Sequence, residues 1–293
     1  MKQVFAGLVA IGLTAFAVGG TFSQGAPSAP LFVAGNNYLA KIGPDGAQQH
    51  RWPGGNNNDA WMLPSGNVLI ADGRAWEADA SGKCVWEYRS EENTGGGCYS
   101  AQRLPDGSTL IGENSTGRIF EVTPTGEKRN IIQVPLNHGN RHQTLRMVRR
   151  LADGSTLVCR SGMGIVERYA PGVFDQPAWT QKVPGLAFAA VADEQGNIYI
   201  SSLNQVQKWS PDHQLLWELK ASETGLPIRN MTGLHLLPNG HLVIGCYGYG
   251  DGIGAFEVTP AKTILWTYRS GEPCNDSHMA VQLLDDTIQQ PNR

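Results

Sequence analysis

Short apolar runs alternate with Gly-centred turns along most of the chain. Two of these runs, Asn67–Ala71 and Ser108–Gly112, each follow directly after such a turn. Strand-like runs on either side of a Gly turn predict a β-hairpin. The turns recur at steps of about 41 to 47 residues, and that period, with only strands inside each unit, predicts a β-propeller. The five turns centre on Gly66, Gly107, Gly154, Gly196 and Gly240.

Superposing the units predicts four strands in each. The third strand and its turn are clearest in Gly117–Gly126 and Gly254–Pro260, whose alternating pattern suits a sheet buried between neighbouring blades. The fourth strand carries a Trp in most units. A large ring at one repeat position is expected to pack between adjacent sheets rather than to bind a ligand. The Trp residues at this position are Trp52, Trp86, Trp179, Trp217 and Trp266.

The two ends of the chain complete the same repeat. Leu31–Gly35, Tyr38–Gly46 and Gln49–Trp52 supply the second to fourth strands of a unit that lacks its first strand. Met279–Leu284 supplies an inner strand with no unit after it. Joined, they predict a sixth blade, and closing the ring removes exposed sheet edges. The fold class is therefore all-β: a six-bladed β-propeller closed by N-terminal strands and a C-terminal inner strand.

The repeat also resembles a known family. Leu104-Pro-Asp-Gly-Ser-Thr-Leu-Ile111, a strand ending in Thr123-Pro-Thr-Gly126, and the Trp pattern of Val85-Trp-Glu-Tyr88 are similar to quinoprotein-like (PQQ-like) propeller repeats and to their six-bladed arylsulfotransferase-like relatives. The resemblance spans Leu31 to about Thr287. It implies a propeller with its functional site at one end of the channel. The quinone-dependent dehydrogenases of this superfamily have eight blades, so bound PQQ is not expected here.

The N-terminus has the composition of an export signal. Lys2 precedes a mostly apolar stretch, Val4–Gly20, and small and polar residues follow. This order predicts a secretory signal peptide with cleavage between Gln24 and Ser28, and the competing interpretation is an uncleaved membrane anchor. We therefore assign 1–28 to a signal peptide and short linker and 29–293 to a single propeller domain. A secreted or periplasmic protein without a membrane span after cleavage is expected.

Charge and cysteine content narrow the possible partners. The net charge is −3 and the basic cluster Arg141–Arg150 is local, so no nucleic-acid partner is predicted. We expect a monomer. The five cysteines fit no zinc pattern and are scattered over separate repeats, which favours mostly free thiols. Cys98 with Cys274 is the one disulfide considered, because both lie in loops expected on the same face.

The loops opposite the Gly turns are the predicted site of function. In a propeller, these loops surround one end of the channel and are rich here in Gly, Asn and ionisable residues. His142 and His278 precede inner strands, so either ring could serve as a general base or nucleophile. The other residues predicted to bind a ligand there are Asp59, Arg74, Tyr99, Glu113, His138, Arg141, Arg146, Arg160, Tyr247 and Asp276.

The residue types at this end suggest several chemistries. The carboxylates of Asp59, Glu113 and Asp276 could orient an imidazole, hold a divalent cation or accept hydrogen bonds from sugar hydroxyls. The alternative is that each serves as a turn or cap residue. The arginines could converge on a carboxylate, sulfate or phosphate. Tyr99 and Tyr247 could stack on a sugar or aryl ring. The identity of any metal is left open.

Three functions follow from these observations. The first is an exported propeller that binds a small polar or anionic ligand, carbohydrate-derived, in the funnel at this end. The second is an enzyme at the same funnel, either an arylsulfotransferase-like transferase or a polysaccharide lyase or hydrolase using His142 or His278. The third is a scaffold for protein partners, which would require a large exposed apolar patch. Whether the chain is an enzyme is left undecided.

Overall fold

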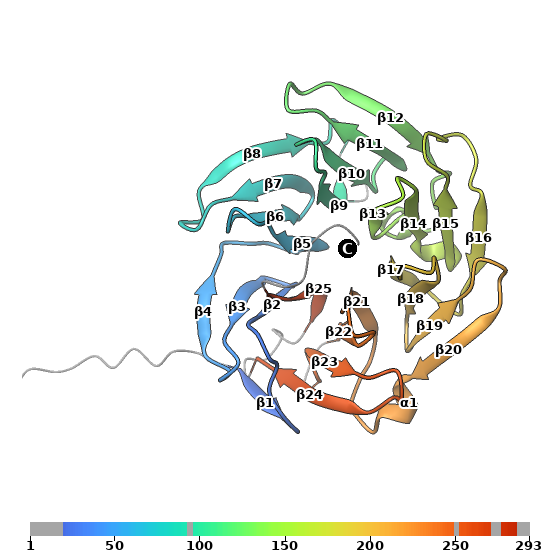
Figure 1. Ribbon diagram of the computed structural model, residues 1–293. Helices are drawn as coiled ribbons and strands as arrows, with labels where there is room; N and C mark the ends of the chain where they lie inside the picture. Colours follow the sequence, from blue (N-terminus) through green and yellow to red (C-terminus); the bar gives the residue numbers. More distant parts are fainter. Residues whose placement is uncertain (1–19, 93–95, 249–251, 271–276, 286–293) are drawn as a thin grey trace, which may run out of the picture.

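Six antiparallel sheets, five with four strands and one with five, form a closed ring in the computed structural model, which describes residues 20–92, 96–248, 252–270 and 277–285. Figure 1 shows the blades arranged around a central axis, with the first strand of each blade innermost. The predicted six-bladed propeller is confirmed. In the described residues no helix is long and apolar enough to cross a membrane.

We number the blades I to VI in chain order. Blade I contains β5 (Asp59–Met62), β6 (Val68–Ala71), β7 (Arg74–Ala78) and β8 (Cys84–Arg89). Blade II contains β9 (Cys98–Arg103), β10 (Thr109–Glu113), β11 (Arg118–Val122) and β12 (Lys128–Gln133). Blade III contains β13 (Val148–Arg150), β14 (Thr156–Arg160), β15 (Ile165–Tyr169) and β16 (Trp179–Lys182), with the 3-10 turns η1 (Arg141–Gln143) and η2 (Ser161–Met163) beside it.

The remaining blades follow the same order. Blade IV contains β17 (Ala187–Ala192), β18 (Ile198–Ser202), β19 (Gln205–Trp209) and β20 (Leu215–Lys220), and the short helix α1 (Ala221–Thr224) follows it. Blade V contains β21 (Met231–Leu236), β22 (Leu242–Cys246), β23 (Ala255–Val258) and β24 (Ile264–Arg269). Blade VI contains β25 (His278–Leu283), β2 (Leu31–Gly35), β3 (Tyr38–Ile42) and β4 (Gln48–Arg51).

The Gly turns form as the repeat predicts. In blade II, the Gly107 amide donates to the Leu104 carbonyl at 3.0 Å. All five Gly residues have φ between +79° and +84°, a region that side chains with a Cβ rarely adopt. At Gly66 a Cβ would meet no atom within 4 Å. The backbone conformation, rather than crowding, therefore requires glycine at that turn.

Blade VI joins the two ends of the chain. β2 pairs with β25 in antiparallel register, with Leu31 opposite Leu283 and Val33 opposite Val281. The alternating apolar residues of both strands are buried in this blade. Because β25 supplies the innermost strand of the sheet that β2, β3 and β4 form, the ring closes where the first and last strands meet.

Blade V has a fifth strand that the repeat does not predict. β1 (Thr21–Ser23) pairs with the outer edge of β24, outside the ring of four-stranded sheets (Figure 1). Phe22 packs its ring against Trp266 and Tyr268 at centroid distances of 5.5 and 5.3 Å. β1 lies within the segment 1–28 that sequence analysis assigned to the signal peptide and linker. The folded part of the chain therefore begins before residue 29.

The Trp residues at the fourth-strand position pack within the protein scaffold. Trp52, Trp179 and Trp266 are buried, while Trp86 and Trp217 are partly buried. Trp217 on β20 donates its indole hydrogen to the Pro260 carbonyl of the next blade at 2.9 Å. These rings therefore fill the spaces between neighbouring sheets near the rim, away from the channel.

Candidate functional site

One guanidinium group lies where several blades meet. Arg146 immediately precedes β13 in blade III, and its backbone amide bonds to the Cys159 carbonyl at 2.8 Å. Its side chain donates to Asn58 Oδ1 at 2.6 Å and to His142 Nε2 at 2.8 Å. The guanidinium carbon lies 5.0 Å from the centre of the Tyr99 ring.

These contacts place Arg146 near the axis of the ring. Asn58 precedes β5 of blade I, and Tyr99 belongs to β9 of blade II. Tyr247 follows β22 of blade V and interacts electrostatically with the same guanidinium. Blades II and V lie opposite each other across the channel (Figure 1). Contacts with blades I and II, together with the electrostatic interaction with blade V, place the guanidinium on the inner side of the ring, at the end opposite the Gly turns.

Arg146 is buried without a counter-ion. Its residue exposure is 8 %, and its Nε atom has no hydrogen-bond partner. Among the described residues no carboxylate forms an ion pair with it, and its contacts are to amide, imidazole and phenol groups. Burial lowers the pKa of Arg146, while the phenol groups of Tyr99 and Tyr247 act in the opposite direction. A buried cation without an anion is costly to desolvate.

The carboxylate that directly follows Asn58 in the sequence is already paired. Asp59 accepts two hydrogen bonds from Arg149, at 2.7 and 2.8 Å, and one from the Ser100 hydroxyl at 2.8 Å. Arg149 and Asp59 are both buried, and the Arg149 guanidinium carbon lies 4.5 Å from the centre of the Trp61 ring. This pair joins blades I, II and III from within and leaves no charge for a ligand. Asp59 therefore lies beside the site as a structural group.

His142 links Arg146 to Tyr99. A guanidinium can only donate, so His142 Nε2 must accept the hydrogen bond from Arg146. Partial burial and the positive charge of Arg146 lower the pKa of His142 to about 4, so the ring is neutral at pH 7. Protonation of the ring would place two donors face to face, at His142 Nε2 and at the Arg146 guanidinium. The single ring hydrogen then lies on Nδ1 and is donated to the Tyr99 oxygen.

A glycine makes room for Tyr99. Gly96 has φ +106°, and a Cβ there would lie 2.3 Å from the Tyr99 hydroxyl oxygen. Any other residue would therefore push the tyrosine away from His142. The run Gly95-Gly-Gly97 in the sequence carried this signal, although its connection with Tyr99 depends on the folded loop. Asn58 is the other contact that sequence reasoning did not single out.

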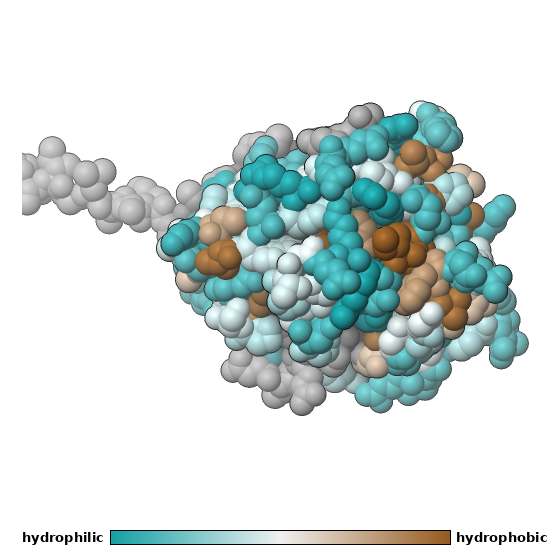
Figure 2. All heavy atoms as spheres, turned by 90° about the horizontal axis from the view of Figure 1, so that it is seen from above, coloured by the Kyte–Doolittle hydropathy of each residue, from teal (hydrophilic) through white to brown (hydrophobic). Residues whose placement is uncertain are grey.

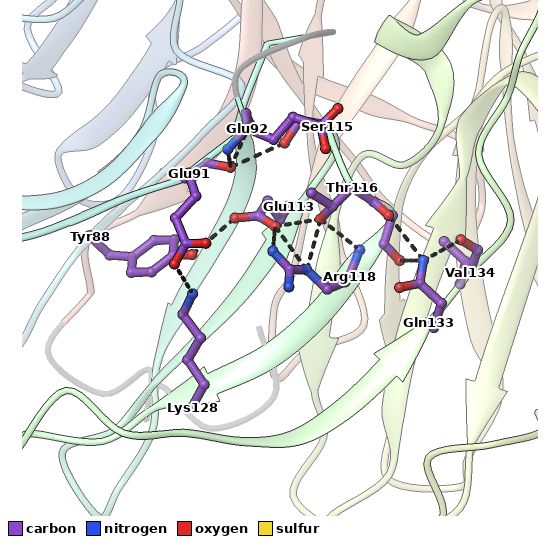
Figure 3. Close-up of polar contacts among 12 residues, drawn as sticks. Tyr88, Glu91, Glu92, Glu113, Ser115, Thr116, Arg118, Lys128, Gln133 and Val134 are labelled. Carbon is purple, nitrogen blue, oxygen red and sulfur yellow. Dashed lines mark hydrogen bonds and ion pairs between the residues drawn. The ribbon is translucent and has the colours of Figure 1, made fainter.

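Glu113 belongs to a separate network between blades I and II. Its carboxylate is buried and accepts hydrogen bonds from Tyr88 at 3.0 Å, from Arg118 at 3.0 Å, and from Thr116. Figure 3 shows these side chains converging on Glu113, with Lys128 and Glu91 paired beside them. Hydrogen bonds from these donors outweigh the effect of burial and hold the pKa of Glu113 below its ordinary value. The carboxylate is thus already neutralised within the scaffold.

His278 is fully buried at the seam between blades V and VI. Its ring lies between those of Tyr38 and Tyr268, at centroid distances of 5.9 and 6.0 Å, and neither ring nitrogen has a hydrogen-bond partner. Burial lowers its pKa to about 3. The structure therefore does not bring His278 together with His142, whose contacts are Tyr99 and Arg146.

The remaining predicted site residues have other surroundings. Arg74 pairs with Glu87 and stacks on Trp76, with its guanidinium carbon 4.1 Å from the ring centre. Arg141 pairs with Glu92 at 3.1 Å, and Arg160 pairs with Glu167 at 2.9 Å. His138 is exposed in a turn. Asp276 lies outside the described residues. Of the predicted set, the structure groups Tyr99, His142, Arg146 and Tyr247.

The described part of the chain has no group of three or more His, Cys, Asp or Glu side chains placed to hold a metal ion. Cys98 and Cys159 are free, buried thiols whose pKa burial raises to about 12. Cys274, the partner considered for Cys98 in a disulfide, lies outside the described residues. Cys84 is an exposed thiol.

The outer surface is mainly hydrophilic. Figure 2 shows one side of the disc, where apolar residues form small separate patches. Of the exposed large apolar side chains, three lie in blade IV, namely Leu203, Leu215 and Leu216. The others are Val85, Ile131, Met163 and Leu265. The scaffold hypothesis stays a prediction.

Comparison with known proteins defines the class by its fold. No family model matches the chain, and no curated protein matches it. A protein of unknown function from Bacteroides caccae has a TM-score of 0.72 at 19% identity, over 87% of this chain and 98% of that one. A streptogramin B lyase has a TM-score of 0.59 at 11% identity, over 86% of this chain and 88% of that one. A catalytically inactive virginiamycin B lyase from Staphylococcus aureus, solved with quinupristin, has a TM-score of 0.58 at 13% identity, over 86% of this chain and 89% of that one.

At these identities the likeness establishes the fold alone: the chain is a six-bladed β-propeller. The resemblance to quinoprotein-like repeats stays a prediction, as do export and the monomeric state.

Proposed function

We propose that this propeller binds a small anionic ligand, carbohydrate-derived, at the end of its channel opposite the Gly turns. The observation that carries the proposal is Arg146, a buried guanidinium near the axis with no carboxylate partner among the described residues. An anion placed beside it would supply the missing counter-charge. Charge-assisted hydrogen bonds of this kind are among the strongest in proteins. The surrounding amide, phenol and imidazole groups suit the hydroxyls of a sugar.

Calorimetric titration tests this proposal with sodium glucuronate, 4-nitrophenyl sulfate and neutral glucose as probes. We expect at least one of the two anions to bind and glucose to bind much more weakly. Arg146→Met should lower anion affinity about 10- to 100-fold, because hydrogen bonds to charged groups contribute roughly 1.5–3 kcal/mol. Arg74→Met is the matched control, since Arg74 is already paired with Glu87. Equal loss in both variants, or no anion binding to the wild type, would reject the proposal.

A second function, catalysis at the same site, is favoured by one observation. His142 is neutral at pH 7 and donates its ring hydrogen to the Tyr99 oxygen, so a phenol whose own hydrogen is unused lies beside the proposed anion. A phenol held in this way suits proton donation in a lyase or a transferase. Release of 4-nitrophenolate from 4-nitrophenyl sulfate, and of unsaturated products from polygalacturonate, would test the two reactions. Activity that is lost in His142→Ala but kept in His278→Phe would support this alternative.

A further inference from the structure

The hydrogen bonds around His142 determine which donors remain for a ligand. Because Nε2 accepts from Arg146, the His142 ring donates from Nδ1 to the Tyr99 oxygen. The Tyr99 hydroxyl hydrogen is therefore not used in this bond. Among the described residues, His142 is the one side chain hydrogen-bonded to that hydroxyl. On the other side of the ring, the Arg146 Nε hydrogen also has no acceptor.

Two unused donors therefore lie on either side of one imidazole. Tyr99 comes from blade II and Arg146 from blade III, and both are buried. Two donors held by the same imidazole suit a ligand group with two acceptor oxygens, and a carboxylate is such a group. Burial raises the pKa of Tyr99, so its phenol keeps its hydrogen at neutral pH.

The charge of the site limits the charge of its ligand. Arg146 contributes one positive charge, whereas its contacts Asn58, Tyr99 and His142 are neutral at pH 7. The adjacent Asp59 and Arg149 cancel each other. A monoanion would leave the site neutral. A phosphate monoester carries about −1.5 to −2 at pH 7 and would leave excess negative charge buried.

We infer that Tyr99 and Arg146 together bind one carboxylate group of a hydroxylated ligand, and that the site selects monoanions over phosphate esters. This inference rests on the proposed function and adds the chemical class of the ligand. It also assigns a recognition role to Tyr99, with His142 as the positioning residue that directs the Tyr99 hydrogen toward the ligand.

Calorimetric titration with sodium glucuronate and glucose 6-phosphate tests whether the ligand is a carboxylate monoanion. At pH 7.5, roughly one and a half units above the second pKa of about 6, we expect glucuronate to bind at least about ten-fold more tightly than the phosphate ester. At about pH 5.5, where the ester is mostly a monoanion, the difference should narrow. Tighter binding of glucose 6-phosphate at pH 7.5 would reject the monoanion inference while leaving anion binding intact. If neither binds, both proposals fail.

Substitution of Tyr99 tests its role. Tyr99→Phe should weaken glucuronate binding about ten-fold or more, because a hydrogen bond to a charged group is lost. Tyr199→Phe is the matched control, since Tyr199 on β18 contacts Lys208 within blade IV. Thermal unfolding of both variants shows whether each remains folded. Wild-type affinity in a folded Tyr99→Phe variant would overturn the assignment.

Discussion

Two arginines three residues apart differ in their electrostatic surroundings. Arg149 is fully buried and forms a two-bond pair with Asp59, whereas Arg146 is buried and has only neutral groups beside it among the described residues. The first arrangement balances its charge within the protein. The second leaves a charge that a ligand can balance, which is a common compromise between stability and function.

Stability measurements should separate these two roles. Arg149→Met is expected to cost about 3–5 kcal/mol, because it leaves Asp59 buried without its partner. Arg146→Met should be neutral or stabilising, because it removes a buried charge that has no counter-ion. Urea unfolding of both variants measures the difference directly. A larger loss for Arg146→Met than for Arg149→Met would contradict this account of the site.

At the scale of elements, the N-terminal strand β1 is the feature that the repeat did not predict. Three residues on the outer edge of β24 bring Phe22 onto Trp266 and Tyr268, which are both fully buried. A signal peptide removed between Gln24 and Ser28 would take β1 with it. If export involves cleavage, a site before Gly20 would keep this strand with the folded domain.

Truncation tests the contribution of β1. A chain beginning at Gly20 should be more stable than one beginning at Ala29 by about 1–3 kcal/mol, the amount expected for burying one large apolar side chain. Thermal or urea unfolding of the two chains provides the measurement, and Phe22→Ala in the longer chain isolates the ring. Identical stability of the two chains would show that β1 adds nothing to blade V.

The whole molecule depends on the seam where its two ends meet. His278 begins the closing strand β25 and is buried between Tyr38 of blade VI and Tyr268 of blade V without a hydrogen bond to its ring. Its pKa is about 3 in the folded protein, against an ordinary value of 6.5. Below pH 6.5 the unfolded chain binds a proton that the folded ring excludes. Stability is therefore lost as the pH falls from about 6.5 toward 3.

Replacing His278 should flatten this dependence. Between pH 7 and 5 the wild type should lose about 2 kcal/mol through this residue, since each pKa unit corresponds to about 1.36 kcal/mol. His278→Phe keeps a ring of similar size and removes the titration. Urea unfolding across this pH range measures how the free energy of unfolding changes with pH in the wild type and in the variant. The same change in both proteins would mean that His278 has the same pKa in the folded and the unfolded chain.

The sequence by itself determined the repeat, the number of blades and the closing blade. These depend on local patterns: Gly at turns with positive φ, alternating apolar residues in strands, and Trp at one repeat position.

Only the tertiary structure decided which ionisable residues remain available to a ligand. Asp59, Arg74, Glu113, Arg141 and Arg160 are ionisable like Arg146 and were predicted to lie at the same end of the propeller, yet each has a partner of opposite charge. The separation reaches 90 residues between Asp59 and Arg149, and no local pattern reveals such a pair. A charge is free for binding only when the folded chain brings no opposite charge to it, and that depends on long-range packing.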